Sequence, residues 1–248
     1  MLSRRNLLAS ALTTFPVYAA LTHLAGLGVA RADESPWLAR QQELALSLAR
    51  GEITPSTWQA EVERFSRDID ISQVIAALRD ARQGKVGRAL PSYPFKTAIR
   101  FLDEKGTPRR LRFASALFDF GANDVITPHA HRHMVSAHLI VRGAFRVRNF
   151  DRVGEVDSAL LLRETGDRIL ETGAISTMST ERDNVHWFVP SGGPASTFDV
   201  IVSRLEPGEP AYVMEPVDPL GATKLENGLI RAPVIGFEES ARIYASTV

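Results

Sequence analysis

Short strand-like segments, separated by turn residues, dominate the sequence between residues 95 and 204. The segments are rich in β-branched and aromatic residues, and clusters of glycine, proline, asparagine and aspartate lie between them. We expect strands at residues 97–102, 110–120, 135–141, 144–150, 158–164, 168–171, 185–189 and 197–204. About eight strands at even spacing, with no helical segment between them, predict a small antiparallel β-barrel or jelly roll.

The region before these strands shows the period of helices instead. Apolar residues near helical spacing predict helices at 36–50, from Pro55 onward, and from Asp70 to about residue 84. We expect these helices to cover one side of the barrel. The predicted fold is therefore mainly β, with an N-terminal helical region at 33–90 and a barrel with a C-terminal extension at 91–248.

The chain after Leu205 is rich in proline. We expect it to be mostly irregular, because proline cannot donate a backbone hydrogen bond to a sheet. A final short helix is predicted at 237–245, on the outside of the barrel.

Residues 1–32 have the features of a targeting segment. The run Ser3-Arg4-Arg5-Asn6-Leu7-Leu8 resembles a twin-arginine export signal, and a moderately apolar stretch follows it. Ala30-Arg31-Ala32 has the small-x-small form of a cleavage site. We therefore expect export by the twin-arginine machinery and a periplasmic location. The alternative is a retained membrane anchor, although His23 and the glycines and threonines nearby make this a weak stop-transfer segment.

Composition excludes several classes of site. The chain has 29 basic and 29 acidic residues, with no long run of lysine or arginine, so nothing indicates nucleic-acid binding. It has no cysteine. In an oxidising compartment this excludes disulfides, and it also excludes a thiolate ligand to a metal.

Histidines are concentrated in one stretch. Four of the six lie between residues 129 and 138. Residues two apart in a strand point to the same face, so His129 and His131 can direct two imidazoles at one metal ion. A later strand that carries His186 could supply the third nitrogen. His133 continues the alternation and could replace His129, but we expect it at the rim of the site.

Two motifs surround these histidines. The first is Pro128-His129-Ala130-His131, followed by Met134, by Gly143 and by a strand that ends in Phe150-Asp151. The second is Asn184-Val185-His186-Trp187-Phe188, followed by Phe198-Asp199-Val200. Both resemble the motifs of cupins, and in particular those of three-histidine thiol dioxygenases such as cysteamine dioxygenase and the plant cysteine oxidases.

The pattern after the first motif supports the three-histidine subgroup. Most cupins carry a glutamate ligand a few residues after the second histidine, whereas this chain has Met134-Val135-Ser136-Ala137 there. The resemblance covers roughly residues 95–205. It departs from the family after the last strand, where Leu205-Glu206-Pro207-Gly208 replaces a Pro-Pro-Tyr segment.

The resemblance implies a function and a set of site residues. It implies Fe(II), with Mn, Ni, Zn or Cu as alternatives, held by His129, His131 and His186. It also implies that dioxygen oxidises a small thiol to a sulfinate. We expect His138 and Asp199 to serve catalysis beside the metal, although each could instead be a buried structural residue. In cysteine dioxygenase an early-strand arginine holds the substrate carboxylate, which makes three residues candidates here: Arg100, Arg110 and Arg112.

Two other functions stay open at this stage. One is a different metal-dependent cupin enzyme, such as a lyase or a carbon–carbon dioxygenase, and a carboxylate able to act as a base would favour the lyase. The other is a non-catalytic cupin that binds a metal or a small ligand. A fourth ligand from His133 or His138 would favour this binding protein.

Overall fold

The computed structural model describes residues 28–31, 36–79 and 87–245. Most of the predicted leader, 1–27 and Ala32, lies outside the described residues. Gly28–Arg31 is described and forms strand β1, which pairs in parallel with β2 (Phe95–Leu102). In the described part of the chain, no helix is both long enough and apolar enough to cross a membrane.

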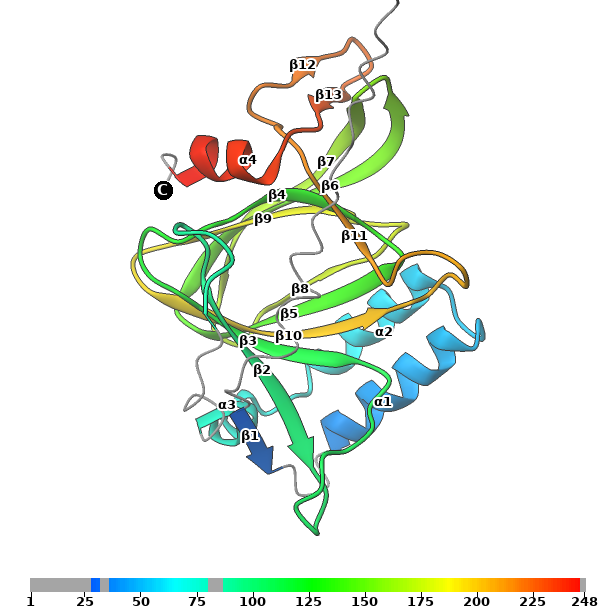
Figure 1. The fold of residues 1–248 in the computed structure, drawn as a ribbon, viewed down its shortest axis with the longest axis vertical. Coiled ribbons are helices and arrows are strands. Elements are labelled where there is room, and N and C mark those ends of the chain that lie inside the picture. Colours follow the sequence, from blue (N-terminus) through cyan, green and yellow to red (C-terminus); the bar gives the residue numbers. More distant parts are fainter. Residues whose placement is uncertain (1–27, 32–35, 80–86, 246–248) are drawn as a thin grey trace, which may run out of the picture.

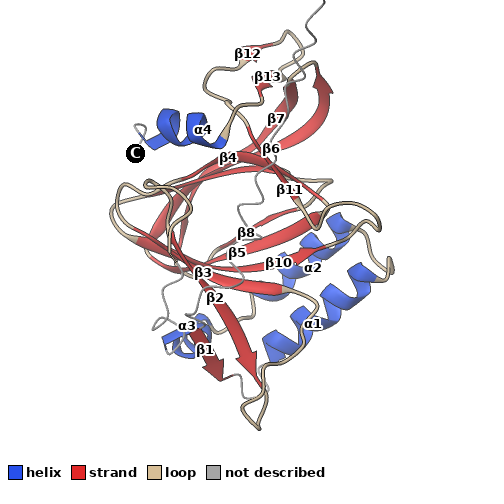
Figure 2. Cartoon of the chain, viewed as in Figure 1, coloured by secondary structure: helices blue, strands red, loops and turns tan. Residues whose placement is uncertain are grey.

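Two β-sheets face each other and form a barrel (Figure 2). The first sheet contains six strands among the described residues, and they pair antiparallel except for β1 with β2. Its order is β1, β2, β3 (Ala114–Phe120), β10 (Ala195–Ser203), β5 (Met134–Arg142) and β8 (Ile175–Met178).

The second sheet contains seven strands, all paired antiparallel. Its order is β11 (Val213–Pro216), β4 (Ile126–Arg132), β9 (Val185–Pro190), β6 (Ala144–Val156), β7 (Ala159–Glu171), β13 (Ile230–Pro233) and β12 (Thr223–Lys224). The fold is thus the mainly β, antiparallel barrel with an N-terminal helical region that the sequence predicted.

The helical region packs on the outer face of the first sheet, as predicted (Figure 1). It consists of α1 (Pro36–Ala49), α2 (Pro55–Ser66) and α3 (Ile71–Arg79). The Thr54 side chain caps α2 by accepting a hydrogen bond from the Thr57 amide, and such a cap stabilises a helix by roughly 1 kcal/mol.

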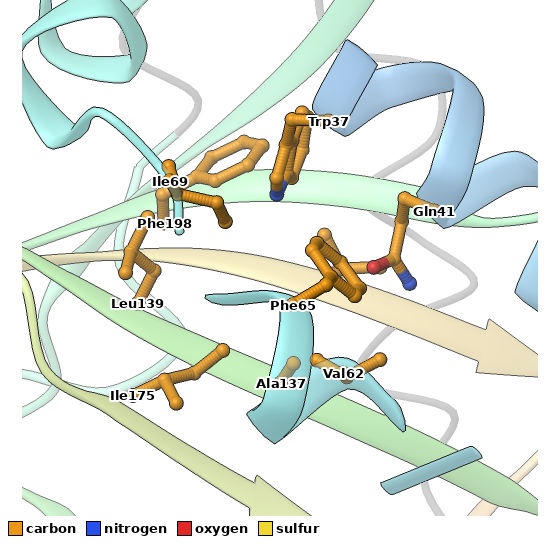
Figure 3. A pocket seen from close by; sticks show the side chains of 10 residues that line it. Trp37, Gln41, Val62, Phe65, Ile69, Ala137, Leu139, Ile175 and Phe198 are labelled. Carbon is orange, nitrogen blue, oxygen red and sulfur yellow. The ribbon is translucent and has the colours of Figure 1, made fainter. Parts of the chain in front are cut away.

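Helices and sheet share one hydrophobic core. Figure 3 shows their seam, where Trp37 and Phe65 from the helical region meet Leu139 and Phe198 from the sheet. The cavity left there has a volume of about 10 Å³, which is no more than the space of one water molecule. The seam is therefore a packed interface and leaves no room for an organic ligand.

The pleat of β5 decides which residues enter the barrel. Val135, Ala137 and Leu139 belong to the core under the helices. The alternate residues point inward, and Ile140 belongs to a second core inside the barrel with Phe118, Phe145 and Phe188. His138 shares this inner face, so the strand that the helices cover also supplies a histidine to the interior.

Several predicted strand boundaries are wrong. The strand predicted at 110–120 begins only at Ala114. The break predicted between the strands at 158–164 and 168–171 does not exist, because β7 runs unbroken from Ala159 to Glu171. Gly166 pairs with Asn149, while Phe150 pairs with Glu164, so one residue is extra at this point. The glycine therefore marks a β-bulge rather than a turn.

The C-terminal extension is more regular than predicted. β11, β12 and β13 follow Leu205, and the first of them joins the second sheet beside β4. In this pairing Met214 lies opposite His131, and Pro216 lies opposite His129. The final helix is confirmed as α4 (Phe237–Tyr244). Strands of two to four residues that contain proline leave little periodic signal, which is why the sequence did not reveal them.

Candidate metal centre

Three histidines from two adjacent strands meet inside the barrel. β4 supplies His129 and His131, and β9 supplies His186, which lies directly opposite His129 in the antiparallel pairing. Each side chain offers one nitrogen, and these nitrogens lie within 4.8 Å of one another. The group contains no carboxylate, in agreement with the lack of a glutamate after His131. The structure thus assembles the three residues that the sequence proposed as ligands.

The spacing of the nitrogens suits one metal ion. The Nε2 atom of His186 lies 3.3 Å from Nε2 of His131 and 3.2 Å from Nε2 of His129. Nitrogens that share one ion at about 2.1 Å lie roughly 3.0–3.4 Å apart, for angles between octahedral and tetrahedral. The donor set therefore fits a transition-metal ion, and it does not by itself distinguish iron from the other candidates.

Hydrogen bonding and burial keep the imidazoles ready to bind a metal. Nδ1 of His129 lies 2.7 Å from the Thr127 carbonyl oxygen, which can only accept, so the proton resides on Nδ1 and Nε2 keeps its lone pair. Burial lowers the pKa of His129 to about 4. It also holds the pKa of His131 and His186 well below the ordinary value. All three rings are therefore neutral near pH 7, as metal binding requires.

The asparagine of the second motif connects the two ligand strands. The Asn184 side-chain amide donates to the His131 carbonyl oxygen at 2.7 Å and to the Ser179 carbonyl oxygen at 3.1 Å. The preceding residue, Asp183, has a positive φ of 53°, and its amide donates to the Asp151 carboxylate at 2.8 Å. Asn184, Asp183 and Asp151 thus hold the turn that delivers His186.

Tyr93 supports the other end of β4, and this role was not predicted from the sequence. Its hydroxyl lies 2.7 Å from the hydroxyl of the buried Thr127, whose carbonyl oxygen orients His129. Burial raises the pKa of Tyr93, so the phenol stays protonated. A tyrosine in a connector rich in glycine and proline carries no local signal of this role.

His138 and Asp199 lie together on the inner face of the first sheet. They are directly opposite in the β5–β10 pairing, and Nδ1 of His138 lies 2.8 Å from the Asp199 carboxylate. On its other side, Nε2 of His138 lies 2.9 Å from the Ser136 hydroxyl. The His138 ring centroid is 4.8 Å from that of His186. The chain thus places a buried serine–histidine–aspartate row beside the three ligands.

His133 lies outside the ligand group. Its backbone φ of 62° ends the alternation between β4 and β5, so the ring does not follow His129 and His131 inward. Nδ1 of His133 lies 3.1 Å from the carboxylate of the exposed Glu206. This is the position at the rim that the sequence analysis expected.

None of the three candidate arginines reaches the histidines. Arg100 and Arg110 are exposed. Arg112 donates from its guanidinium to the backbone carbonyl oxygens of Ser203 and Arg204, at 3.0 and 3.3 Å. The expectation that one of them binds substrate is therefore not supported, because Arg100 and Arg110 are exposed and the Arg112 guanidinium is bound to backbone carbonyl oxygens.

Comparison with known proteins gives distant likenesses of fold. No protein-family model matches the sequence, and no curated protein matches it. Similar solved structures include procruciferin, an 11S globulin from Brassica napus, with 10% identity over 51% of this chain and 28% of that chain, at a TM-score of 0.36.

Two further structures are similar to a comparable extent. Oxalate oxidase aligns with 19% identity over 50% of this chain and 56% of its own, at a TM-score of 0.34. KdgF from Halomonas sp. aligns with 17% identity over 46% of this chain and 82% of its own, at a TM-score of 0.33. The alignments thus span about half of this chain, and less than two thirds of procruciferin and of oxalate oxidase. Any assignment of activity must come from the site itself.

Proposed function

We propose that this protein is an exported, three-histidine, metal-dependent dioxygenase that oxidises a small thiol to a sulfinate with dioxygen. The observation that carries the proposal is the set of three buried, neutral imidazoles that contains no carboxylate. Three neutral ligands leave the charge of Fe(II) uncompensated and leave coordination positions open. Both oxygen atoms of dioxygen end on sulfur, so the thiol RSH gives the sulfinic acid RSO₂H without a further reductant.

Each residue of the site has a role in this proposal. His129, His131 and His186 would hold Fe(II), which supplies adjacent positions for a thiolate and dioxygen and the electron transfer between them. Asp199 favours the proton on Nδ1 of His138, and the Ser136 hydroxyl then donates to Nε2. This row can accept the thiol proton, while Phe145, Phe188 and neighbouring apolar residues exclude water.

The first test combines metal content with oxygen consumption. Protein exported in its native host is expected to contain about one iron per chain and to consume dioxygen with a panel of small thiols. The matched control is the His133→Asn variant, which changes a histidine outside the ligand group. Iron-free native protein, or iron-loaded protein that consumes no dioxygen with any thiol, would reject the proposal.

A metal-dependent lyase is a second candidate. The observation in its favour is the buried Asp199, whose carboxylate contacts His138 beside the ligands and could receive a proton through it. The two functions differ in their use of dioxygen. If product forms at the same rate without dioxygen, and the Asp199→Asn variant forms none, the protein is a lyase.

Export through the twin-arginine machinery belongs to the same proposal. This route carries folded proteins, so iron could be loaded before copper competes for a nitrogen site. Changing Arg4 and Arg5 together to lysine is expected to leave the protein in the cytoplasm, as measured by cell fractionation. Normal amounts of the double variant in the periplasm would show that this assignment is wrong.

A further inference from the structure

One of the three ligand histidines lacks a partner for its second ring nitrogen. Nε2 of His186 faces the Nε2 atoms of His129 and His131, at 3.2 and 3.3 Å. Burial lowers the pKa of His186, so the ring carries one proton, and metal binding through Nε2 requires that proton on Nδ1. This Nδ1 atom is buried and has no hydrogen-bond partner among the described residues. His186 therefore needs an acceptor.

His129 shows what such an acceptor does. The Thr127 carbonyl oxygen lies 2.7 Å from its Nδ1 atom and holds the proton there. Imidazoles that bind a metal almost always donate their second N–H to a carboxylate, a carbonyl oxygen or water, which fixes the tautomer and the orientation of the ring. In the described part of the chain, no backbone carbonyl serves His186 in this way. A neighbouring side chain is therefore the candidate.

The strand pairing places an asparagine beside His186. One row across the second sheet contains, in order, His129, His186, Asn149 and Gly166. Directly paired residues of antiparallel strands point to the same face, with Cβ atoms about 4.5–5.5 Å apart. Val147, two residues before Asn149 on β6, belongs to the core inside the barrel, so Asn149 also faces the interior. Asn149 is thus the neighbour of His186 on the side away from His129.

The side-chain amide of Asn149 can accept this proton. The residue is 1% exposed, and neither Oδ1 nor Nδ2 has a hydrogen-bond partner among the described residues. Its other neighbour in the row, Gly166, has no side chain that could bind the amide. A half-turn about the Cβ–Cγ bond exchanges the oxygen and the nitrogen, so the oxygen can face His186. Buried amides are nearly always hydrogen-bonded, which makes an unsatisfied donor and an unsatisfied acceptor on adjacent residues a natural pair.

We propose that Asn149 is a positioning residue for the metal centre, whose side-chain oxygen accepts the Nδ1 proton of His186 when Nε2 binds a metal ion. The hydrogen bond fixes the tautomer and the direction of this ring, as the Thr127 carbonyl oxygen does for His129. A neutral amide adds no negative charge, so the metal ion keeps the full charge that three neutral imidazoles leave it. The inference concerns metal binding itself and applies to the dioxygenase and the lyase alike.

Zinc affinity of the full chain, measured by competition with a chelator of known affinity, tests the inference. Asn149→Leu is close in volume and removes the acceptor, and it is expected to weaken zinc binding about 10- to 100-fold. Asn149→Asp keeps an acceptor and should bind zinc at least as tightly as the wild type. The matched control is Ser176→Ala, which removes another buried hydroxyl without a printed partner, opposite His138, and should leave zinc affinity unchanged.

Nuclear magnetic resonance of the cobalt(II)-loaded protein reports on the hydrogen bond directly. Cobalt(II) moves the Nδ1 protons of its imidazole ligands far from all other signals, and the wild type should show three of them. Asn149→Leu should move or broaden one of these signals and leave the other two in place. Without metal, Asn149→Leu should be at least as stable to urea as the wild type, because it removes an unsatisfied buried amide.

Four results would overturn the inference. They are equal zinc affinity of wild type and Asn149→Leu, an unchanged cobalt spectrum in that variant, weak zinc binding by Asn149→Asp, and lower stability of metal-free Asn149→Leu, which would show that Asn149 serves the fold. None of these measurements depends on oxygen consumption. A protein that passes all four and oxidises no thiol would keep this inference and reject the proposed dioxygenase.

Discussion

At the scale of single residues, the site depends on which histidines point inward. His129 and His131 are two residues apart on β4 and share a face, whereas the positive φ of His133 takes it out of that alternation. His138 is inward on a different strand, where Asp199 and Ser136 already occupy its nitrogens. Five histidines close in sequence or space therefore divide into three ligands, one neighbour and one rim residue.

Replacing the five histidines one at a time should reveal this division. His129→Ala, His131→Ala and His186→Ala are each expected to abolish stoichiometric iron binding, because two neutral ligands do not hold Fe(II) against water. His133→Ala and His138→Ala should weaken it by at most about 10- to 100-fold, as loss of a neighbouring group does. Metal content after dialysis measures this. Loss of iron in His133→Ala with retention in His129→Ala would move the ligand set to His131, His133 and His186.

The lowered pKa values of the ligands also predict a pH dependence of stability. Histidine in an unfolded chain has a pKa near 6.5, whereas burial lowers that of His129 to about 4. Between these values the unfolded chain binds more protons than the folded one. The stabilisation is therefore fully present above about pH 6.5 and is lost as the pH falls toward 4.

Urea unfolding of the metal-free protein between pH 7.5 and pH 4.5 measures this effect. The free energy of unfolding should fall by up to about 1.4 kcal/mol per pH unit for each buried histidine. His129→Asn should reduce that slope, and His133→Asn is the matched control. A slope that is the same in wild type and His129→Asn would contradict the assignment.

At the scale of elements, a tight connection fixes two strands of the barrel, one from each sheet. Gly143 joins β5 to β6 with a φ of 73°. A Cβ atom added there would lie 2.9 Å from the Ala195 Cβ atom and 2.9 Å from the Pro194 carbonyl oxygen. The glycine is thus required both by the backbone conformation and by the close approach of β10. The same strand β10 carries Asp199 and Thr197 to the interior.

Gly143→Ala should therefore lower the free energy of unfolding by more than the backbone cost alone. Gly106 provides the comparison, because it has a φ of 75° and nothing within 4 Å of an added Cβ. We expect Gly106→Ala to lower the free energy of unfolding by about 1 kcal/mol, because alanine is strained in the left-handed conformation. Gly143→Ala should lower it by roughly 1–3 kcal/mol more, because the added methyl group overpacks the contact with β10. Denaturant unfolding of both variants tests this, and equal losses would show that the contact with β10 relaxes freely.

At the scale of the whole molecule, the helices and the barrel share their packing. Trp58 and Leu38 are completely buried in the core that also contains Phe198 and Val200. Those two strand residues alternate with Thr197 and Asp199 on β10, so the helices cover one face of the strand whose other face serves the site. The helical region therefore supports the site from outside the barrel, where the Gln59 side-chain amide of α2 also donates to the Asp183 carboxylate at 3.3 Å.

Truncation tests this dependence. A fragment of residues 33–248 is expected to remain soluble, whereas a fragment of 95–248 should aggregate or unfold at a lower temperature, because it exposes the apolar outer face of β5 and β10. Thermal unfolding and sedimentation of the two fragments measure this. In the 33–248 fragment, Trp58→Ala should lower the free energy of unfolding by about 3–5 kcal/mol, a smaller effect than removal of the helices. If the two fragments have the same solubility and the same melting temperature, the helices are not part of the barrel core.

The sequence by itself determined the features that depend on neighbours along the chain. Short strand-like segments at even spacing between turn residues predicted the barrel, the helical spacing predicted α1 to α3, and His129 with His131 predicted a shared face. These patterns are local, because a strand repeats every two residues and a helix every 3.6. The missing glutamate after His131 likewise predicted a site of three histidines.

Only the tertiary structure decided which strands became neighbours and in which register. It placed β11 beside β4 and brought Asn149 opposite His186. A shift of one residue in a strand exchanges its two faces, and no local pattern fixes that shift for residues far apart in the chain. The set of side chains that surrounds the three histidines follows from this long-range register.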